Sequence, residues 1–413
     1  MEACKRRKME CNSDQDGRDS VVVTCRATNS GTKEIHCKRM GNVKIVDCSP
    51  ERNTRNLIAD DQIIINNSKL ATKDSNCSRL HPILSDELLD NVPLTEVYTT
   101  NVLKPRHISS VVIELNLHAP IPELSHLKRI NRRAVLLFPK HVCGTDEVYD
   151  HLRSLGYDPA HLDGTVEVAN VASIPPKVRS QYDIVNKLWP CNFHENKYLE
   201  KLVCNGLFNA EEILQHEEYM RIALDVAKLR KNSKTVGAVV VDPKLGSVVS
   251  VGYNESDENP CKHACMVAVD NVAVSQGGGT WRWKPETVTD DGLNTGGIPR
   301  NVLVALRAKY TNVKFGATPF KTKETLENPE DGPYLCTGYY VYVTHEPCIM
   351  CAMALVHSRM KRVFYGVKVK EGGLGSTCKI HTINNLNHHF EVFAGLLEEE
   401  CSKLQNNISG IES

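Results

Sequence analysis

The sequence predicts an α/β protein in which a mixed sheet lies between two layers of helices, preceded by a small α+β domain and a disordered N-terminal tail. The order of predicted helices and strands in two parts of the chain supports this fold class. After about residue 205 the order is helix, strand, strand, helix, strand, helix, strand, which places helices on both faces of one sheet. Between about residues 90 and 185 the order strand, helix, strand, helix, strand indicates the smaller domain. With 413 residues, the chain is long enough for two or three domains.

The N-terminal extension, residues 1–83, is expected to be mostly disordered. It is rich in Asn, Ser, Asp, Thr and Lys and has no sustained apolar period. The basic run at residues 5–8 could be a nuclear signal, although a solvated charge run is the favoured interpretation. We expect ordered structure to begin near Leu84.

Composition limits the possible partners and compartments. The 50 basic and 50 acidic residues give a formal net charge of zero, so any basic surface must be local. The N-terminus has no apolar signal region, and no apolar run of about 18 residues predicts a membrane span. The 16 cysteines then point to a reducing compartment in which most are free thiols. We expect the protein in the nucleus and the cytoplasm.

The small domain is expected to span 84–190. Alternating or buried apolar runs predict its strands, and apolar residues at helical spacing predict its helices. The expected strands are 96–100, 134–138 and 166–172, and the expected helices are 108–117 and 146–155. Gly156 follows the second helix and is typical of a helix C-terminus.

The second domain is expected to span 205–397. Its first helix starts at Asn209, because Glu212 follows three residues later as in a capping box. The other expected elements are strands at 236–241, 247–252, 340–344 and 362–367 and helices that open at His263 and at Cys348. A long insertion at about 276–332 interrupts this domain, and 398–413 forms a C-terminal tail.

Two helix N-termini carry potential metal ligands. Cys348 and Cys351 follow Pro347 at the mouth of a helix, where a spacing of three puts both sulfurs on one face. The positive end of the helix dipole favours their thiolate forms. With His263, which opens an earlier helix, they make the Cys/Cys/His set that a zinc ion with one open position requires.

Other interpretations of these three residues remain open. A Cys-x-x-Cys pair at a helix start is also typical of redox proteins, and the pattern could be coincidence. Zn²⁺ is favoured, because redox chemistry does not explain Pro347, the strand before it or the upstream His263. Cys261 is a further possible ligand.

The residue two positions after His263 decides the functional interpretation. Zinc nucleobase deaminases have His-x-Glu followed by Pro-Cys-x-x-Cys, and the Glu transfers the proton of the metal-bound water. Here Cys265 stands at the Glu position, so we expect a site that is catalytically inactive or severely impaired and has no catalytic residue. Cys265 either fills the pocket as a small apolar side chain, which we favour, or closes the site as a fourth ligand. Direct ligation would require a distorted first turn, because residues two apart do not share a helix face.

These motifs resemble the non-catalytic subunit of eukaryotic tRNA wobble-adenosine deaminase. The resemblance covers roughly residues 90–395 and is strongest over 332–366, which includes the stretch Thr-His-Glu-Pro-Cys-Ile-Met-Cys at 344–351. The stretches that carry it are 332–338, 344–359, 362–366, 386–393, 105–106 and 126–130.

The resemblance implies a cytidine-deaminase-like three-layer α/β/α domain with a five-stranded sheet. It implies a heterodimer in which a catalytic deaminase subunit keeps the Glu and converts wobble adenosine to inosine. The subunit that resembles this chain keeps the zinc ligands, here His263, Cys348 and Cys351, and usually has an aliphatic residue where this chain has Cys265. Its N-terminal domain helps to hold the tRNA.

Basic residues in the small domain are candidates for contact with the tRNA anticodon arm. They are Lys104, Arg106, Lys128, Arg129, Arg132 and Arg133. An ordinary solvated face is the alternative. Trp281, Arg282 and Trp283 in the insertion could stack on bases, contact the partner subunit or anchor the structure.

The favoured hypothesis is therefore a zinc-containing, catalytically inactive subunit of a heterodimeric tRNA adenosine deaminase. One alternative is a self-sufficient zinc deaminase of a nucleotide or RNA base, against which the missing Glu argues. Another is an RNA-binding assembly module with a structural zinc.

Overall fold

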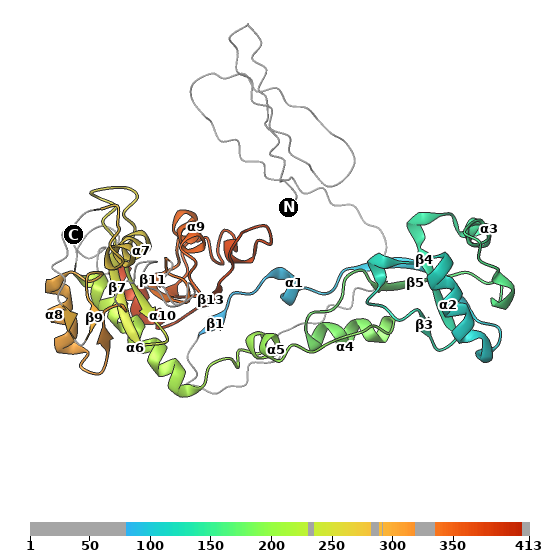
Figure 1. The fold of residues 1–413 in the computed structure, drawn as a ribbon, viewed down its shortest axis with the longest axis horizontal. Coiled ribbons are helices and arrows are strands. Elements are labelled where there is room, and N and C mark those ends of the chain that lie inside the picture. Colours follow the sequence, from blue (N-terminus) through green and yellow to red (C-terminus); the bar gives the residue numbers. More distant parts are fainter. Residues whose placement is uncertain (1–79, 230–234, 282–288, 291, 319–334, 407–413) are drawn as a thin grey trace, which may run out of the picture. The chain divides into compact units, whose positions relative to one another are not determined.

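The computed structural model describes residues 80–229, 235–281, 289–290, 292–318 and 335–406 (Figure 1). Most of the expected N-terminal extension lies outside these ranges. Described structure begins at Leu80, slightly before the expected Leu84, because the two-residue strand β1 adds to the edge of the main sheet. The short helix α1 (Asp86–Leu89) follows it.

The main sheet has seven strands in the order β1-β13-β12-β11-β6-β7-β10. Strand β11 lies between β12, to which it is parallel, and β6, to which it is antiparallel, so the sheet is mixed as expected. The strands are β1 (His81–Pro82), β6 (Gly237–Asp242), β7 (Ser247–Tyr253), β10 (Lys314–Phe315), β11 (Tyr340–His345), β12 (Arg362–Val367) and β13 (Glu391–Ala394). The five longer strands form the expected five-stranded core, with a two-residue strand added at each edge.

Helices cover both faces of this sheet. Side chains alternate along β11, so that Val341 and Val343 point to one face and Tyr342 to the other. The Val341 face packs against α7 (Ala264–Ser275) and α9 (Ile349–His357). The opposite face packs against α6 (Ala210–Lys228), α8 (Arg300–Lys309) and α10 (Glu398–Asn406). The three-layer α/β/α architecture is confirmed.

Glycines set the spacing between layers at two positions of the β6–β7 hairpin. A Cβ on Gly237 would lie within 3.0 Å of backbone atoms of Ala223 and Ala227 in α6. A Cβ on Gly252 would lie equally close to Ala264 and Ala268 in α7. The two glycines therefore allow one helix to pack closely against each face of the hairpin.

The start of α6 confirms the expected capping box. The Asn209 Oδ1 accepts a hydrogen bond from the Glu212 backbone N–H at 2.9 Å, and the Glu212 Oε2 accepts one from the Asn209 N–H at 2.8 Å. These bonds satisfy donors that the first helical turn leaves free. The sequence pattern therefore places the first helix of the domain correctly.

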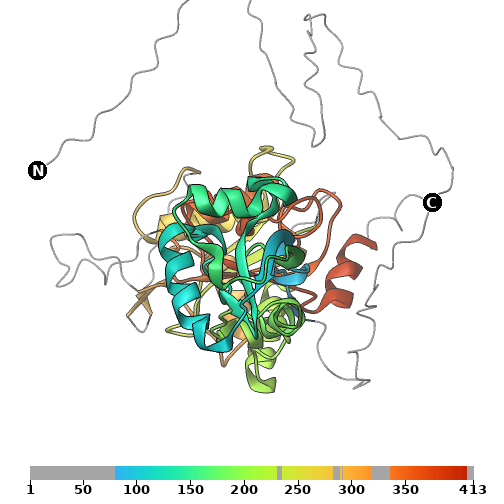
Figure 2. The ribbon, with the colours of Figure 1, turned by 90° about the vertical axis from the view of Figure 1, so that its right-hand side faces the viewer.

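The small domain is drawn in blue-green to green in Figures 1 and 2. It is built on a second, antiparallel sheet in the order β3-β4-β2-β5. One face packs against α2 (Ile108–His118) and α3 (Val148–Ser154), and the other against α4 (Arg179–Leu188). Its strands are β2 (Leu94–Asn101), β3 (Ile130–Asn131), β4 (Ala134–Pro139) and β5 (Glu167–Ala172), and α5 (Lys197–Val203) follows α4. The expected strands and helices are confirmed, and Gly156 follows α3 with a φ of 84°.

The described parts of the insertion contain regular structure. Strands β8 (Thr289–Asp290) and β9 (Leu293–Asn294) form a hairpin, and α8 and β10 follow it. The expected C-terminal tail begins with α10, whose Cys401 and Leu404 are buried in the core. Over the described residues, none of the helices is long and apolar enough to cross a bilayer.

Candidate metal centre

The sheet and its two helices bring His263, Cys348 and Cys351 together. The His263 Nδ1 lies 3.4 Å from the Cys348 Sγ and 3.6 Å from the Cys351 Sγ. All three ligand atoms lie within 4.8 Å of one another. A tetrahedral zinc with Zn–S of about 2.3 Å and Zn–N of about 2.0 Å separates its sulfur and nitrogen ligands by about 3.5 Å. The ligand atoms therefore have the spacing that a tetrahedral zinc requires.

Each ligand lies at or near a helix N-terminus. His263 is the N-cap residue of α7, and Cys348 is the N-cap residue of α9. The hydrogen bond between the Cys348 and Cys351 thiols and their burial raise the pKa of Cys348. A bound divalent cation reverses this preference for the neutral thiol, because metal ligation deprotonates it.

Cys265 is close to the ligands but is not one of them. Its side chain is buried in the same core cluster as Cys351. Its sulfur is outside the set of atoms that lie within 4.8 Å of one another. The exposed Cys261 is also outside this set. Neither cysteine therefore belongs to the three-residue set that could hold an ion.

Glu346 is the acidic residue closest to the ligands in sequence, but its carboxylate is already engaged. It is 4 % exposed and accepts hydrogen bonds from the backbone N–H groups of Val369, Leu374 and Ser376 at 3.3, 3.0 and 3.0 Å. The Ser376 hydroxyl donates another. Glu346 therefore holds the loop after β12 against the start of α9. Among the described residues, no carboxylate joins the ligand set.

The sequence interpretation missed this role of Glu346. A signal was present in the Gly372-Gly373 pair, because a Cβ on Gly372 would collide with the Glu346 carboxylate. Gly373 also donates its backbone N–H to the Pro347 carbonyl at 2.8 Å. The loop thus packs directly on the segment that carries Cys348.

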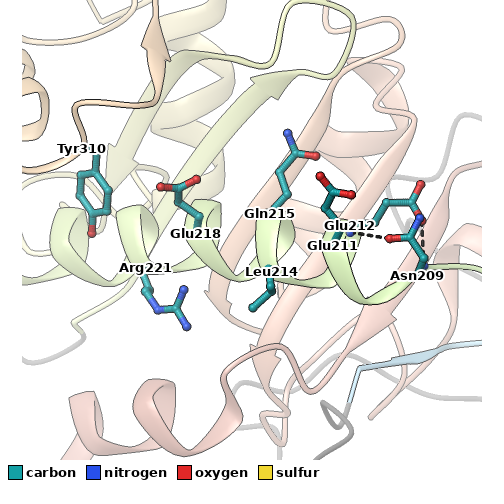
Figure 3. A pocket seen from close by; sticks show the side chains of 8 residues that line it. All are labelled: Asn209, Glu211, Glu212, Leu214, Gln215, Glu218, Arg221 and Tyr310. Atoms are coloured by element: carbon teal, nitrogen blue, oxygen red, sulfur yellow. Dashed lines mark hydrogen bonds between the residues drawn. The ribbon is translucent and has the colours of Figure 1, made fainter.

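A separate hollow of about 590 Å³ lies along the exposed side of α6 (Figure 3). It is lined by Asn209, Glu211, Glu212, Leu214, Gln215, Glu218, Arg221 and Tyr310. Because α6 and α7 cover opposite faces of the sheet, this hollow is remote from the metal ligands. It contributes nothing to the metal centre.

Comparison with known proteins identifies the family. The model of the cytidine and deoxycytidylate deaminase zinc-binding region matches residues 213–367. A human protein named "Probable inactive tRNA-specific adenosine deaminase-like protein 3" is 36% identical over 334 residues, which are 78% of this chain and 90% of that protein. The zebrafish (Danio rerio) protein of the same name is 34% identical over 78% of this chain and 93% of its own length. The chain belongs to the tRNA-specific adenosine deaminase-like protein 3 family.

A more distant relative is the "tRNA-specific adenosine deaminase subunit TAD3" of Saccharomyces cerevisiae. It is 26% identical over 293 residues, which are 67% of this chain and 76% of that protein. The word inactive in the vertebrate names agrees with Cys265 at the position of the proton-transferring Glu. This member of the deaminase-like protein 3 family thus combines a deaminase zinc-binding region with a cysteine at the catalytic position.

Arg129 does not lie on the exposed surface that was expected to contact the tRNA. It is 8 % exposed, and its Nε donates a hydrogen bond to the Leu136 carbonyl at 2.7 Å. Its Nη2 donates to the carbonyls of Ala119 and Leu137 at 2.8 and 2.9 Å. Burial lowers its pKa to about 10. Arg129 holds the small domain together, so the prediction that it contacts RNA is wrong.

The other basic candidates are exposed. They are Lys104, Arg106, Lys128, Arg132 and Arg133. Arg132 has a φ of 57° in the tight turn between β3 and β4. The Nη2 of Arg133 donates to the Val102 and Leu103 carbonyls at 3.0 and 2.6 Å, which braces the loop that carries Lys104.

Trp281 is held against α7. The Asp270 carboxylate accepts its backbone N–H at 3.2 Å, and the Lys262 Nζ lies 5.9 Å from its ring centroid. Its ring and Lys262 line a hollow of about 480 Å³. Arg282 and Trp283 lie outside the described residues.

Proposed function

We propose that this chain is the zinc-binding, non-catalytic subunit of a heterodimeric tRNA adenosine deaminase that converts wobble adenosine to inosine. The metal centre carries this proposal, because it keeps a complete ligand set beside a cysteine where deamination requires a carboxylate. The name of the yeast relative, a deaminase subunit, supports a partner. The catalytic deaminase subunit supplies the missing carboxylate in its own active site.

His263, Cys348 and Cys351 would hold the zinc ion. When bound, zinc would supply a cross-link between the N-termini of α7 and α9, and it would polarise any water in its open position. Proton transfer from that water needs a general base, which contributes roughly 10²–10⁴-fold to catalysis. Cys265 does not replace that base, because it lacks the carboxylate that transfers the proton in zinc nucleobase deaminases. The centre therefore maintains the fold beside the partner and performs no deamination.

The small domain would bind the tRNA anticodon arm. Its exposed side chains Lys104, Arg106 and Lys128 can each approach a phosphate, and Arg132 projects from a turn. Such contacts give affinity without reading sequence. The choice of tRNA would then rest on the complex as a whole.

The decisive experiment measures inosine in an anticodon stem-loop. The full chain alone is expected to give none, whereas the full chain with its co-purified deaminase partner is expected to convert adenosine. Turnover by the single chain would support the alternative of a self-sufficient deaminase. A complex that binds RNA but contains no deaminase would support the alternative of an assembly module with a structural zinc.

A charge-reversal series tests the tRNA surface. Lys128→Glu in the assembled complex is expected to weaken stem-loop binding and reduce the slope of log affinity against log salt by about 1. Lys403→Glu, at an exposed position on α10, is the matched control. Equal salt slopes for wild type and Lys128→Glu would remove Lys128 from the RNA surface.

We also propose that the protein occurs in both nucleus and cytoplasm. The cysteines point to a reducing compartment, and the basic run at residues 5–8 is taken here as a nuclear signal, which is the alternative to the solvated charge run favoured from the sequence alone. Fluorescence microscopy of the full chain, with and without alanines at 5–8, tests this location. Loss of the nuclear fraction in the alanine variant is expected.

A further inference from the structure

The loop after β2 is fixed to the rest of the small domain by backbone contacts. Val102 pairs with Leu162 in an isolated antiparallel bridge, and the Leu103 N–H donates a hydrogen bond to the His161 carbonyl at 2.9 Å. The loop then enters a 3₁₀ turn at Pro105–His107, which runs directly into α2. The backbone that carries the exposed basic side chains of this loop is therefore held by the small domain itself.

A pair of stacked histidines extends this attachment to the side chains. The rings of His107 and His161 are parallel to within 9°, and their centroids are 4.1 Å apart. Two imidazolium cations would repel each other at this distance, so the stack favours neutral rings. Burial, together with the nearby His161, Arg106 and Lys104, lowers the pKa of His107 and favours its neutral form.

The His107 ring accepts a hydrogen bond from Arg106. The Arg106 Nε–H donates to the His107 Nε2 at 3.1 Å. Because a guanidinium can only donate, Nε2 must be the unprotonated nitrogen of the ring. Among the described residues, the Arg106 side chain forms no ion pair and no other hydrogen bond. Its terminal nitrogens Nη1 and Nη2 therefore remain available for an external acceptor.

Two other arginines of the small domain use their guanidinium groups differently. Arg129 donates from Nε and Nη2 to buried carbonyls. Arg133 donates from the same two nitrogens to the carbonyls of Val102 and Leu103. Both of these arginines hold the fold. Arg106 is anchored through Nε alone, which leaves the two terminal nitrogens that can form parallel hydrogen bonds with a phosphate.

We propose that His107, held by its stack on His161, is a positioning residue that orients the Arg106 guanidinium toward one phosphate of the RNA. The inference rests on the proposed binding of tRNA by the small domain. The stack fixes the plane of the His107 ring, and the hydrogen bond to Nε2 fixes the guanidinium relative to that ring. An arginine oriented in advance loses less rotamer freedom when it binds, so it binds a phosphate more tightly.

The test measures stem-loop binding by the assembled complex at several salt concentrations. His107→Phe keeps an aromatic ring that can stack on His161 but has no acceptor for the Arg106 Nε–H. Its affinity is expected to fall about tenfold, as on loss of one charge-assisted hydrogen bond. The slope of log affinity against log salt is expected to decrease by about 1, as in Arg106→Ala, although His107→Phe removes no charge from the neutral ring.

A double variant and a matched control separate positioning from other effects. Because both single variants remove the same phosphate contact, the double variant Arg106→Ala/His107→Phe is expected to bind as tightly as Arg106→Ala alone. His141→Phe, at an exposed histidine of the same domain, is the control and is expected to keep the wild-type affinity and salt slope. Circular dichroism checks that each variant is folded. His161→Ala removes the stack from the other side and provides the same test if His107→Phe does not fold.

The outcomes distinguish the inference from the proposed function. Wild-type affinity and salt slope in His107→Phe, together with a reduced slope in Arg106→Ala, would overturn the inference and leave the tRNA surface intact. Additive losses in the double variant would also overturn it, because His107 would then act independently of Arg106. An unchanged slope in both Arg106→Ala and Lys128→Glu would overturn the proposed tRNA surface itself.

Discussion

The two faces of the main sheet differ in the side chains that they bury. The α7–α9 face is lined mostly by small residues such as Ala238, Val240 and Val343, together with buried cysteines. The α6 face carries aromatic rings, with Tyr342 stacked on Phe364 at 4.9 Å and Phe364 on Phe393 at 5.1 Å. On the α7–α9 face, small side chains let the helices that carry the candidate metal ligands pack close to the sheet. The α6 face supplies most of the contacts between large apolar side chains.

The aromatic face also contains a buried polar pair. The His216 Nδ1 and the Tyr342 hydroxyl are 2.8 Å apart, and the His216 ring stacks on Phe364 at 4.4 Å. Aromatic pairs of this kind contribute about 0.5–1.5 kcal/mol each beyond the area they bury. The division between faces predicts that variants on one face change metal binding and variants on the other change stability.

The largest expected effect is on metal content. Cys348→Ser is expected to reduce zinc affinity on the order of a hundredfold or more, because a thiolate ligand is lost. Cys204→Ser, at the exposed end of α5, is the matched control and is expected to retain full zinc content. Metal analysis after dialysis measures both. Undiminished zinc in Cys348→Ser would place the ion elsewhere.

The two layer-spacing glycines provide a matched pair across the sheet. Gly252→Ala and Gly237→Ala both force a methyl group against helix backbone, so each is expected to lower the free energy of unfolding by about 1–3 kcal/mol. Only Gly252→Ala displaces the first turn of α7, so it alone is expected to weaken zinc binding. Denaturant unfolding and chelator competition measure the two effects. Equal losses of zinc affinity in both variants would contradict the separation of the faces.

The smallest expected effect is a pH dependence of the aromatic face. Burial lowers the pKa of His216 to about 4, from an ordinary value near 6.5, so the folded protein resists its protonation while the unfolded chain accepts it. Its contribution to stability is present above pH 6.5 and is lost as the pH falls toward 4, by up to about 1.4 kcal/mol per pH unit. In His216→Phe this slope should decrease between pH 6.5 and 4. An unchanged slope would show that His216 is not the titrating group.

Much of the fold could be predicted because the patterns were local. The capping box at Asn209 and the alternation in β11 specify their elements without reference to distant residues. The position of the candidate ligands Cys348 and Cys351 could be predicted for the same reason, since a strand followed directly by a helix start places both residues at the N-terminus of that helix. The assembly of His263 with them follows once the two helices pack on one face.

The misses arose where the tertiary context decides. Arg129 has the same local sequence features as the exposed Lys128, and only the packing of β4 and the end of α2 gives its guanidinium buried carbonyls to bind. Strand β13 is four residues long and is stabilised by pairing with β12, so its own sequence was too short to identify it. The role of Glu346 depends on a loop that begins more than twenty residues later.

The β6–β7 hairpin has a consequence for any change in the first turn of α7. With no side chain at residue 252, the helix that starts after His263 rests directly on the strand, and its position is set by backbone contact rather than by a side chain that could adjust. The backbone contact at Gly252 therefore sets the distance between the His263 imidazole and the sulfurs of Cys348 and Cys351. A chain that lacks the proton-transferring Glu can consequently keep the shape of the metal pocket, because that shape depends on the strand–helix backbone contact and not on the side chain at residue 265.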